Sequence, residues 1–508
     1  MANLSKDLKI IILILCLGFS SRLIALPFST TTHTDAVGRL YIAQNWLDNP
    51  HIITHGLWLP LHTYLTGGVI WFINDPILAP ILLNICFSVA TAIPLYFFTK
   101  NEFGKPACWF VSCAFLFYPI AFRNSLQALS DTPFAFFVAM ALLFISRSRK
   151  KNGSWKDALI AGLFMNLSAM LRYEGWVLIP LLAVLLWRKP RILLTFCLCS
   201  TLFPLFWMVG NYIHHGSFIH SIKAHKATEL DSRQFKEVIT ITERILRIMF
   251  FPSILIFGMT FFVFILSFLG AIKALYKRQE NSCFLIPFAG LFIFYFFNAV
   301  TDSLAMEARY SLTLGLLLLP FSAEILNRFY SVKKRRLLSV IIIASMFPLS
   351  YTPHLIFALS PSTLEAIPES SRDPRTFLEA IPRLSKNTEL ISKSVNKNIN
   401  IINDRLIVIG FTPSVTNLVS FYSHLNPQKI ARFPNNLHSI SESENFSLFF
   451  DDHDTGIIVC DKDKVAIKSL YSIINNTLKR DNSNKLLSLS QLIDADNFAI
   501  YRYQVTEK

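Results

Sequence analysis

Long apolar stretches recur along the first 358 residues of this chain, separated by short polar connections. They cover residues 10–28, 77–99, 106–122, 130–146, 156–171, 173–187, 191–213, 246–272, 283–300, 309–327 and 337–357. Most approach the roughly 20 residues that an α-helix needs to cross the hydrocarbon of a bilayer. The pattern therefore predicts an α-helical polytopic membrane domain of about eleven transmembrane helices over residues 1–358.

The remaining residues, 359–508, have the mixed polarity of a soluble domain. Strand-like runs at 400–410, 455–460 and 498–504 alternate with helix-like runs at 375–384, 414–425 and 465–478. Such alternation is typical of a small α/β domain. We therefore expect a C-terminal soluble α/β domain after the membrane domain.

One apolar segment, residues 57–73, is ambiguous. It is long enough to span, but it contains Pro60 and a Gly-Gly pair. Its rings, including Trp58, His62 and Trp71, are of the amphipathic kind that prefers the membrane interface. We expect it to lie in the interface; if it spanned, the amino terminus would change sides.

Charge supports the membrane interpretation and gives it a direction. Only 16% of the 508 residues are charged, against about 25% in soluble proteins. The net charge of +15 resides in short connections, and basic clusters fall at every second one, at 100–105, 147–151, 188–191, 273–278 and 328–336. This is the positive-inside pattern, so it argues against nucleic-acid binding.

The other connections then face the exterior. These are the loop 29–76 with its interfacial helices, the turn 123–130, the long loop 214–245, the turn 301–308, and the α/β domain 359–508. In a bacterium this would be a multi-pass protein of the plasma (inner) membrane with a periplasmic C-terminal domain.

Ionisable residues near a bilayer are costly, so they point to function. Here they collect at four exterior junctions: Asp35 and Arg39 in HTDAVGRL, Arg123 and Asp131 in FRNSLQALSDTP, Arg172 and Glu174 in LRYEGW, and Glu307, Arg309 and Tyr310 in MEARYSL.

Each junction also has a structural explanation. Asp35 could form an ordinary ion pair with the arginine four residues on. Asp131 could cap the helix that follows it. Arg172 and Glu174 could pair between helices, and Arg309 could be an interface anchor.

The histidines of the long exterior loop are a weaker candidate site. His214, His215, His220 and His225 lie in a polar segment, where we expect solvent exposure in preference to metal binding.

The order of these motifs resembles the GT-C superfamily, in particular the branch of protein mannosyltransferases and aminoarabinose transferases that use polyprenyl-phosphate sugars. The similarity runs from about residue 10 to 330. After Asp35, the segments that carry it are WLPLHTYL (58–65), FGKPA (103–107), LQALSDTP (126–133), AMLRYEGW (169–176), GNYIHHGSF (210–218) and EARYSL (307–312).

The sequence also departs from the family pattern. Ala36 follows Asp35 where the family often has a second acid, and Pro60 stands alone where two prolines are common. The tail lacks the Trp-Trp-Asp motif of oligosaccharyltransferase catalytic subunits.

The resemblance implies an inverting hexosyl- or pentosyltransferase with a lipid-phosphate-sugar donor and a lipid, protein or glycan acceptor. Asp35 would be the catalytic residue, since a carboxylate can take the acceptor proton. The donor phosphate would be bound by Arg309, Arg172 and Arg123, because arginine grips phosphate bidentately. The residues that would orient the acceptor or a cation are Asp131, Glu174, Glu307 and His62.

The sequence does not decide whether the reaction needs a divalent cation such as Mg or Mn. Other interpretations are a different lipid-linked glycan polymerase or ligase, and a lipid-linked sugar transporter or flippase. Transporters often show repeats and charges at mid-membrane, whereas this chain shows no repeat and gathers its charges at one face.

Overall fold

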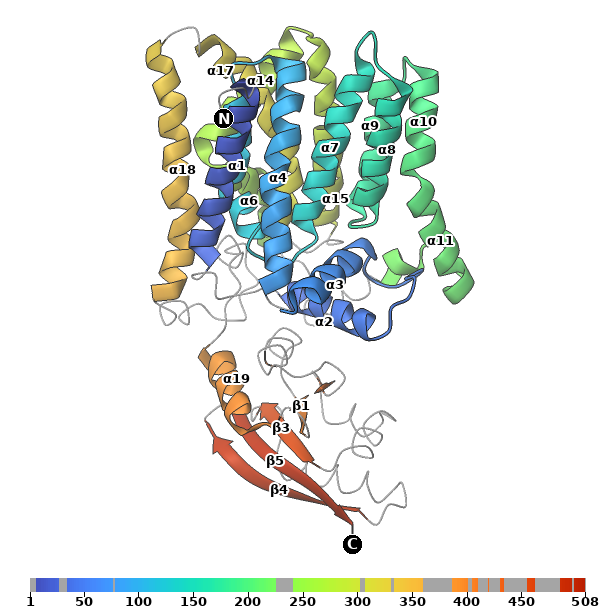
Figure 1. The fold of residues 1–508 in the computed structure, drawn as a ribbon, viewed down its shortest axis with the longest axis vertical. Helices are drawn as coiled ribbons and strands as arrows, with labels where there is room; N and C mark the ends of the chain where they lie inside the picture. The colour runs from blue at the N-terminus through green and yellow to red at the C-terminus, as the bar shows by residue number, and fades with distance from the viewer. Residues whose placement is uncertain are drawn as a thin grey trace. The chain divides into compact units, whose positions relative to one another are not determined.

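The computed structural model describes residues 6–26, 34–75, 78–224, 241–301, 307–329, 333–359, 386–400, 404–409, 419, 430–433, 455–461, 485–495 and 498–507. The chain divides into two compact units. The first holds α1 and the helices from α3 to α18, and the second holds α2, α19 and the strands (Figure 1). The sequence-based division at residue 358 did not anticipate that α2 would group with the tail.

The first unit consists of helices throughout its described residues. They are α1 (Lys6–Ala25), α3 (Leu61–Ile73), α4 (Leu78–Phe103), α5 (Cys108–Phe117), α6 (Pro119–Asn124), α7 (Asp131–Arg149), α8 (Trp155–Ala169), α9 (Glu174–Ala183), α10 (Pro190–Ser200), α11 (Leu202–His215), α13 (Ile241–Gly258), α14 (Phe261–Tyr276), α15 (Leu285–Val300), α16 (Ser311–Leu318), α17 (Ser322–Phe329) and α18 (Lys333–Leu359). Short 3₁₀ turns, η2 (Val184–Leu186), η3 (Glu280–Phe284), η4 (Ala308–Tyr310) and η5 (Leu319–Phe321), join some of them.

Length and composition identify the membrane-spanning helices. Within the described residues, 6 helices are long and apolar enough to cross a membrane, or up to 7 if a bent pair counts as one span. Shorter apolar helices add to the bundle, at 61–73, 108–117, 174–186 and 337–350. The multi-pass prediction is confirmed, while the count of about eleven spans is not.

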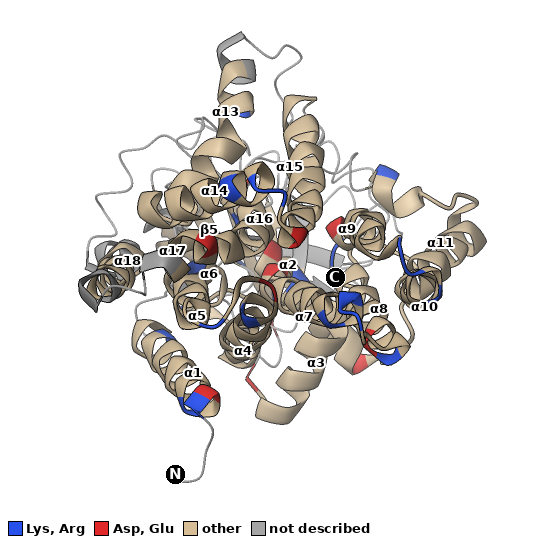
Figure 2. Cartoon of the chain, turned by 90° about the horizontal axis from the view of Figure 1, so that it is seen from above, with Lys and Arg blue, Asp and Glu red and all other residues tan. Residues whose placement is uncertain are grey.

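Contacts between distant connections show that the basic clusters share one end of the helix bundle, which we call the basic end. Asp7, at the start of α1, pairs with Lys100 at 2.8 Å and with Lys105 at 2.9 Å. Lys189 donates to the carbonyl of Lys150 at 2.6 Å. Seen from above, Figure 2 shows blue Lys and Arg positions near the ends of α1, α10 and α14.

The same contacts bear on the ambiguous segment 57–73. Because the start of α1 lies at the basic end, an even number of crossings separates it from residues 100–105, and α1 and α4 supply both. The helix in that segment, α3, has 13 residues. At 1.5 Å per residue it is about 20 Å long, short of a hydrocarbon core of roughly 30 Å. Both observations favour the interfacial interpretation.

The predicted run 246–272 is not one straight helix. It forms α13 and α14, which meet at an angle of 108°. The break falls at Thr260, whose φ is +70°, a conformation that a β-branched residue rarely adopts. Apolar periodicity could not reveal this bend, because the residues on both sides of it are predominantly apolar.

A fully buried arginine ties the first helices together. Arg22 of α1 donates to Ser88 Oγ of α4 at 3.0 Å and to the carbonyl of Leu116 at 2.8 Å. Its Nε donates to Ser125 Oγ at 3.0 Å. These bonds satisfy a buried cation and fix the turn that follows α6, which belongs to the candidate site.

The second unit is built on a five-stranded sheet. It contains α2 (Thr34–Asp48), α19 (Lys386–Asn398), β1 (Arg405–Ile409), β2 (Ile430–Phe433), β3 (Thr455–Asp461), β4 (Lys485–Asp494) and β5 (Phe498–Glu507). The strand order is β2-β1-β3-β5-β4. Strands β1, β2 and β3 are parallel, and β5 and β4 add antiparallel.

The sheet confirms the predicted α/β tail. The strand-like runs at 400–410, 455–460 and 498–504 coincide with β1, most of β3 and most of β5. The sequence did not predict α19, β2 or β4. The helical predictions at 375–384 and 465–478, and nearly all of 414–425, lie outside the described residues.

Candidate functional site

The candidate site lies at the end of the first unit opposite the basic end, where α6, α7, α9 and η4 begin or end. The turn between α6 and α7 is held by side chains of neighbouring elements. Asn84 Nδ2 of α4 donates to the carbonyls of Gln127 and Leu129, the latter at 2.8 Å. Thr132 Oγ1 donates to the carbonyl of Asn124 at 3.1 Å. The turn therefore presents Asp131 in a fixed position.

Asp131 does not cap α7, contrary to the alternative considered from sequence. It lies in the first turn of α7, and the residue at the cap position, Ser130, makes no capping hydrogen bond. The carboxylate turns away from its own helix because a buried guanidinium attracts it. Asp131 Oδ1 accepts from Arg172 Nη1 at 2.8 Å.

Arg172 joins two carboxylates. Besides its bond to Asp131, it binds Glu174 bidentately, with Nη2 to Oε1 at 2.6 Å and Nε to Oε2 at 3.1 Å. The three side chains are at most 11% exposed. Arg172 and Glu174 thus form the ion pair that the sequence suggested, and burial makes the loss of either partner costly, because the other charge would be left uncompensated.

A tyrosine of α15 completes this network. Tyr295 donates its hydroxyl to Glu174 Oε1 at 3.1 Å, and its ring stacks on Tyr310 with centroids 5.6 Å apart. The sequence analysis missed Tyr295. Its signal was slight, a single phenol within the apolar run of α15.

Tyr310 connects this network to a second arginine. Its ring lies 5.0 Å from the guanidinium carbon of Arg172 and 5.5 Å from that of Arg309. Arg309 also pairs with Glu307, two residues before it. The side chain of Arg309 is 10% exposed and that of Glu307 is 26% exposed.

Arg123 stands beside this second pair. The charges of Arg309 and Glu307 both act on it. Within the described part of the chain, Arg123 Nε and Asp131 Oδ2 are buried and have no hydrogen-bond partner. One donor and one acceptor of the site are therefore available to a ligand.

The structure thus brings together six predicted site residues, namely Arg123, Asp131, Arg172, Glu174, Glu307 and Arg309. Three positive and three negative charges balance at neutral pH. His62 of α3 is buried, and its Nδ1 lies 3.4 Å from Thr66 Oγ1 on the same helix. Asp35 lies in the first turn of α2, in the second unit, and is half-buried.

Histidines form a separate group at the same end of the first unit. The ring of His55 stacks on that of His214 at 3.9 Å between centroids, and His215 stacks on His220 at 3.8 Å. His214 and His215 are exposed, as predicted, while His225 lies outside the described residues. Burial and the charges of neighbouring histidines lower the pKa of His55 below its usual 6.5.

A metal ion is a separate question. Among the described residues, no group of three or more His, Cys, Asp or Glu side chains is arranged to hold one.

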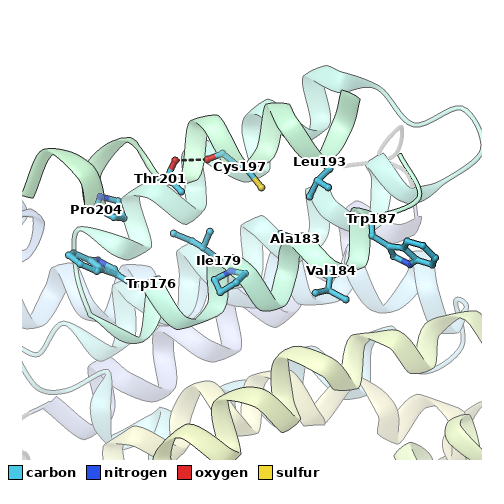
Figure 3. Close-up of a pocket in the computed structure, with 10 residues that line it drawn as sticks. Trp176, Ile179, Ala183, Val184, Trp187, Leu193, Cys197, Thr201 and Pro204 are labelled. Atoms are coloured by element: carbon cyan, nitrogen blue, oxygen red, sulfur yellow. Dashed lines mark hydrogen bonds between the residues drawn. The ribbon is translucent and has the colours of Figure 1, made fainter. Parts of the chain in front are cut away.

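An apolar groove runs along α9, η2, α10 and α11 (Figure 3). Its volume is about 610 Å³, and it extends from Trp176 to Trp187. The hydroxyl of Thr201 in its wall is satisfied by the carbonyl of Cys197 at 2.8 Å. Trp176, at one end of the groove, is two residues from Glu174 in the sequence.

Comparison with known proteins gives one family match and several structural matches. Residues 54–210 match the sequence profile of the family described as dolichyl-phosphate-mannose-protein mannosyltransferase. That range contains four of the six clustered site residues and precedes Glu307 and Arg309. No curated protein matches the chain in sequence.

Solved structures extend the similarity to nearly the whole chain. ArnT from Cupriavidus metallidurans in the apo state has a TM-score of 0.62 at 13% identity, over 98% of both chains. The same ArnT bound to undecaprenyl phosphate has a TM-score of 0.62 at 12% identity, over 97% of each. The apo oligosaccharyltransferase of Archaeoglobus fulgidus has a TM-score of 0.51 at 12% identity, over 95% of this chain and 69% of that one.

Identities this low show a shared fold. The structural matches confirm the predicted helical membrane fold with its C-terminal α/β region. The family match over residues 54–210 agrees with the predicted resemblance to polyprenyl-phosphate-sugar-dependent glycosyltransferases. The individual roles of the site residues stay predictions.

Proposed function

We propose that this chain transfers a sugar from a polyprenyl-phosphate carrier to a lipid, protein or glycan acceptor at the exterior face of the membrane. The observation that carries this proposal is the buried cluster of three arginines and three carboxylates at the end of the helix bundle opposite the basic end. The family match over residues 54–210 and the likeness to an ArnT bound to undecaprenyl phosphate support it.

The donor phosphate is assigned to Arg309 and Arg123. Arg309 pairs with Glu307 at the rim of the cluster, where Glu307 is 26% exposed, and Arg123 offers a buried Nε that lacks a partner within the described residues. A phosphate carries more negative charge than a carboxylate and accepts bidentate hydrogen bonds from guanidinium. Both arginines can therefore hold it as it leaves.

Arg172 is assigned a role other than phosphate binding. Its donors already face Asp131 and Glu174, so a phosphate would have to displace a carboxylate from it. We assign to it the orientation of those two acids. Asp131 Oδ2 then remains as an acceptor for a sugar or acceptor hydroxyl.

The carrier's tail is assigned to the apolar groove between Trp176 and Trp187. A dry groove beside spanning helices suits an isoprenoid chain, and the groove ends two residues from Glu174. The phosphate can then reach the polar site while the tail stays in the bilayer.

Asp35 is assigned as the base, on its position after the first spanning helix. The acceptor hydroxyl or amine gives its proton to Asp35 as its oxygen or nitrogen bonds to the anomeric carbon. The bond from that carbon to the phosphate oxygen breaks, and the electron pair leaves with the phosphate. Attack from the opposite side inverts the anomeric centre.

A deletion strain tests the function. Mass spectrometry of its glycolipids and glycoproteins beside wild type should reveal one glycan that is lost, and the wild-type gene should restore it. Asp35→Asn should not restore it, although it inserts normally. Asp48→Asn, an exposed acid at the other end of α2, is the matched control and should restore it.

Two outcomes would contradict the proposal. An unchanged glycan profile in the deletion strain would remove the glycosyltransferase assignment, and restoration by Asp35→Asn would remove the base. The sidedness has its own test, since cysteines introduced at positions 35 and 149 should react with an impermeant label from opposite sides. Labelling from one side would refute the exterior location.

A further inference from the structure

The helix that carries Asp35 belongs structurally to the C-terminal domain. Residues Val37 and Tyr41 of α2 are buried in one hydrophobic cluster with side chains of α19 and the sheet. The other members include Ile391 and Val395 of α19, Leu406 and Val408 of β1, Ile457 and Val459 of β3, and Phe498 and Ile500 of β5. More than 300 residues of sequence separate the two partners.

The sheet residues of this cluster lie on one face. Along β1 the cluster takes Leu406 and Val408 and skips Ile407, as expected where alternate residues point to opposite faces. The strand register agrees, because Val408 is paired with Val459. All three β1 residues are fully buried, so the two faces can be compared by substitution.

On α2 the anchoring residues and the carboxylate lie on different sides. Val37 and Tyr41 are four residues apart and share one stripe of the helix. At about 100° per residue, Asp35 lies roughly 140° from the middle of the stripe that they form. One stripe of α2 is thus buried in this cluster, whereas Ala36, Leu40 and Ala43 are buried outside it and Asp35 lies away from the stripe.

We infer that the C-terminal domain is a positioning domain, which holds the catalytic base through the packing of Val37 and Tyr41 in this hydrophobic cluster. The inference rests on the proposed role of Asp35. A helix of 15 residues is marginally stable alone, so this packing decides where α2 lies. Because misplacing a reacting group by about 1 Å can cost roughly 10²-fold in rate, the tail controls transfer without touching substrate.

The test uses full-length variants in the deletion strain and in purified form. Val408→Ala and Tyr41→Ala should slow restoration of the lost glycan by about tenfold or more. Tyr41→Phe, which keeps the ring, should restore it nearly normally. Affinity for undecaprenyl phosphate should stay within about twofold in all three, since the proposed phosphate ligands are in the other unit.

Two variants serve as matched controls. Ile407→Ala removes more side chain from the same strand on the opposite face, and Ile42→Ala truncates an exposed side chain of α2. Both should keep transfer within about twofold of wild type. Hydrogen exchange of α2 amides should quicken in Val408→Ala and not in Ile407→Ala.

The results separate this inference from the proposed function. If Val408→Ala and Ile407→Ala reduce transfer equally, the tail is needed only for folding and the inference is overturned. Faster exchange in α2 with unchanged transfer would overturn it as well. Full activity of Asp35→Asn would refute the base itself, whereas an inactive Asp35→Asn beside normal Val408→Ala and Tyr41→Ala would refute only the positioning role.

Discussion

The buried arginine of the site gives the sharpest prediction about stability. Arg172→Met keeps most of the side-chain volume and removes the charge, leaving Asp131 and Glu174 without their cation. These carboxylates are 4% and 9% exposed, so water cannot replace it. Breaking a buried pair costs about 3–5 kcal/mol, and the free energy of unfolding should fall by at least that much.

A compensated variant isolates the cause. Arg172→Met combined with Asp131→Asn and Glu174→Gln removes all three charges while keeping the shapes of the side chains. No uncompensated buried charge then remains, and that charge is the main cost of breaking a buried pair, so most of the lost stability should return. Transfer activity should not return, because the orientation of the acids is lost.

The free energy of unfolding of both variants can be measured on purified protein in nanodiscs. Unfolding is followed by tryptophan fluorescence and by protease susceptibility. Tyr295→Phe provides the scale for a single bond, since it removes one hydrogen bond to a charged group, worth about 1.5–3 kcal/mol. If the triple variant is as unstable as Arg172→Met, the loss comes from packing and the electrostatic reasoning is wrong.

Three further predictions follow from other parts of the structure. Arg309→Lys should weaken undecaprenyl phosphate binding by about tenfold, measured on the purified protein, because lysine cannot bind phosphate bidentately. Gly210→Ala should destabilise by about 1–3 kcal/mol, because a methyl group there would collide with the carbonyl of Thr54. The lowered pKa of His55 means that the unfolded state binds its proton first, so stability should be complete above pH 6.5 and fall as the pH drops below it.

Each has a control within the chain. Arg188→Lys, on the predicted inner side, should leave phosphate binding unchanged, and equal losses in both variants would contradict the assignment of Arg309. Gly68→Ala has open space around its new methyl, so destabilisation as large as that of Gly210→Ala would refute the collision. His55→Gln should reduce the loss of stability below pH 6.5. If stability depends on pH as in wild type, other groups cause that loss.

Some features of this protein follow from sequence because they depend on local composition. A helix must carry enough apolar residues to cross a bilayer, and the basic residues that flank it indicate which end stays on the inner side of the membrane. The alternating basic clusters therefore predicted the shared basic end that the contact of Asp7 with Lys100 confirms. The strands β1, β3 and β5 were likewise visible as short apolar runs, because a buried strand is apolar over its whole length.

The sequence also singled out the six charged residues that the structure brings together, since charges beside apolar helices had to be compensated somewhere. It could not determine how they pair. Asp131 could cap a helix or bind a distant arginine, and only the packing of α7 against α8 and α9 decided for Arg172. Tyr295 entered the network for the same reason, as did the bend at Thr260.

Asp35 shows the difference most clearly. The surrounding sequence shows that Asp35 follows the first spanning helix and that α2 has an apolar stripe. It does not show which part of the chain packs against that stripe. The partner is a sheet formed more than 300 residues later. The hydrophobic effect is non-directional, so an apolar stripe does not specify which distant segment will cover it. Only the tertiary structure could therefore assign α2 to the C-terminal domain.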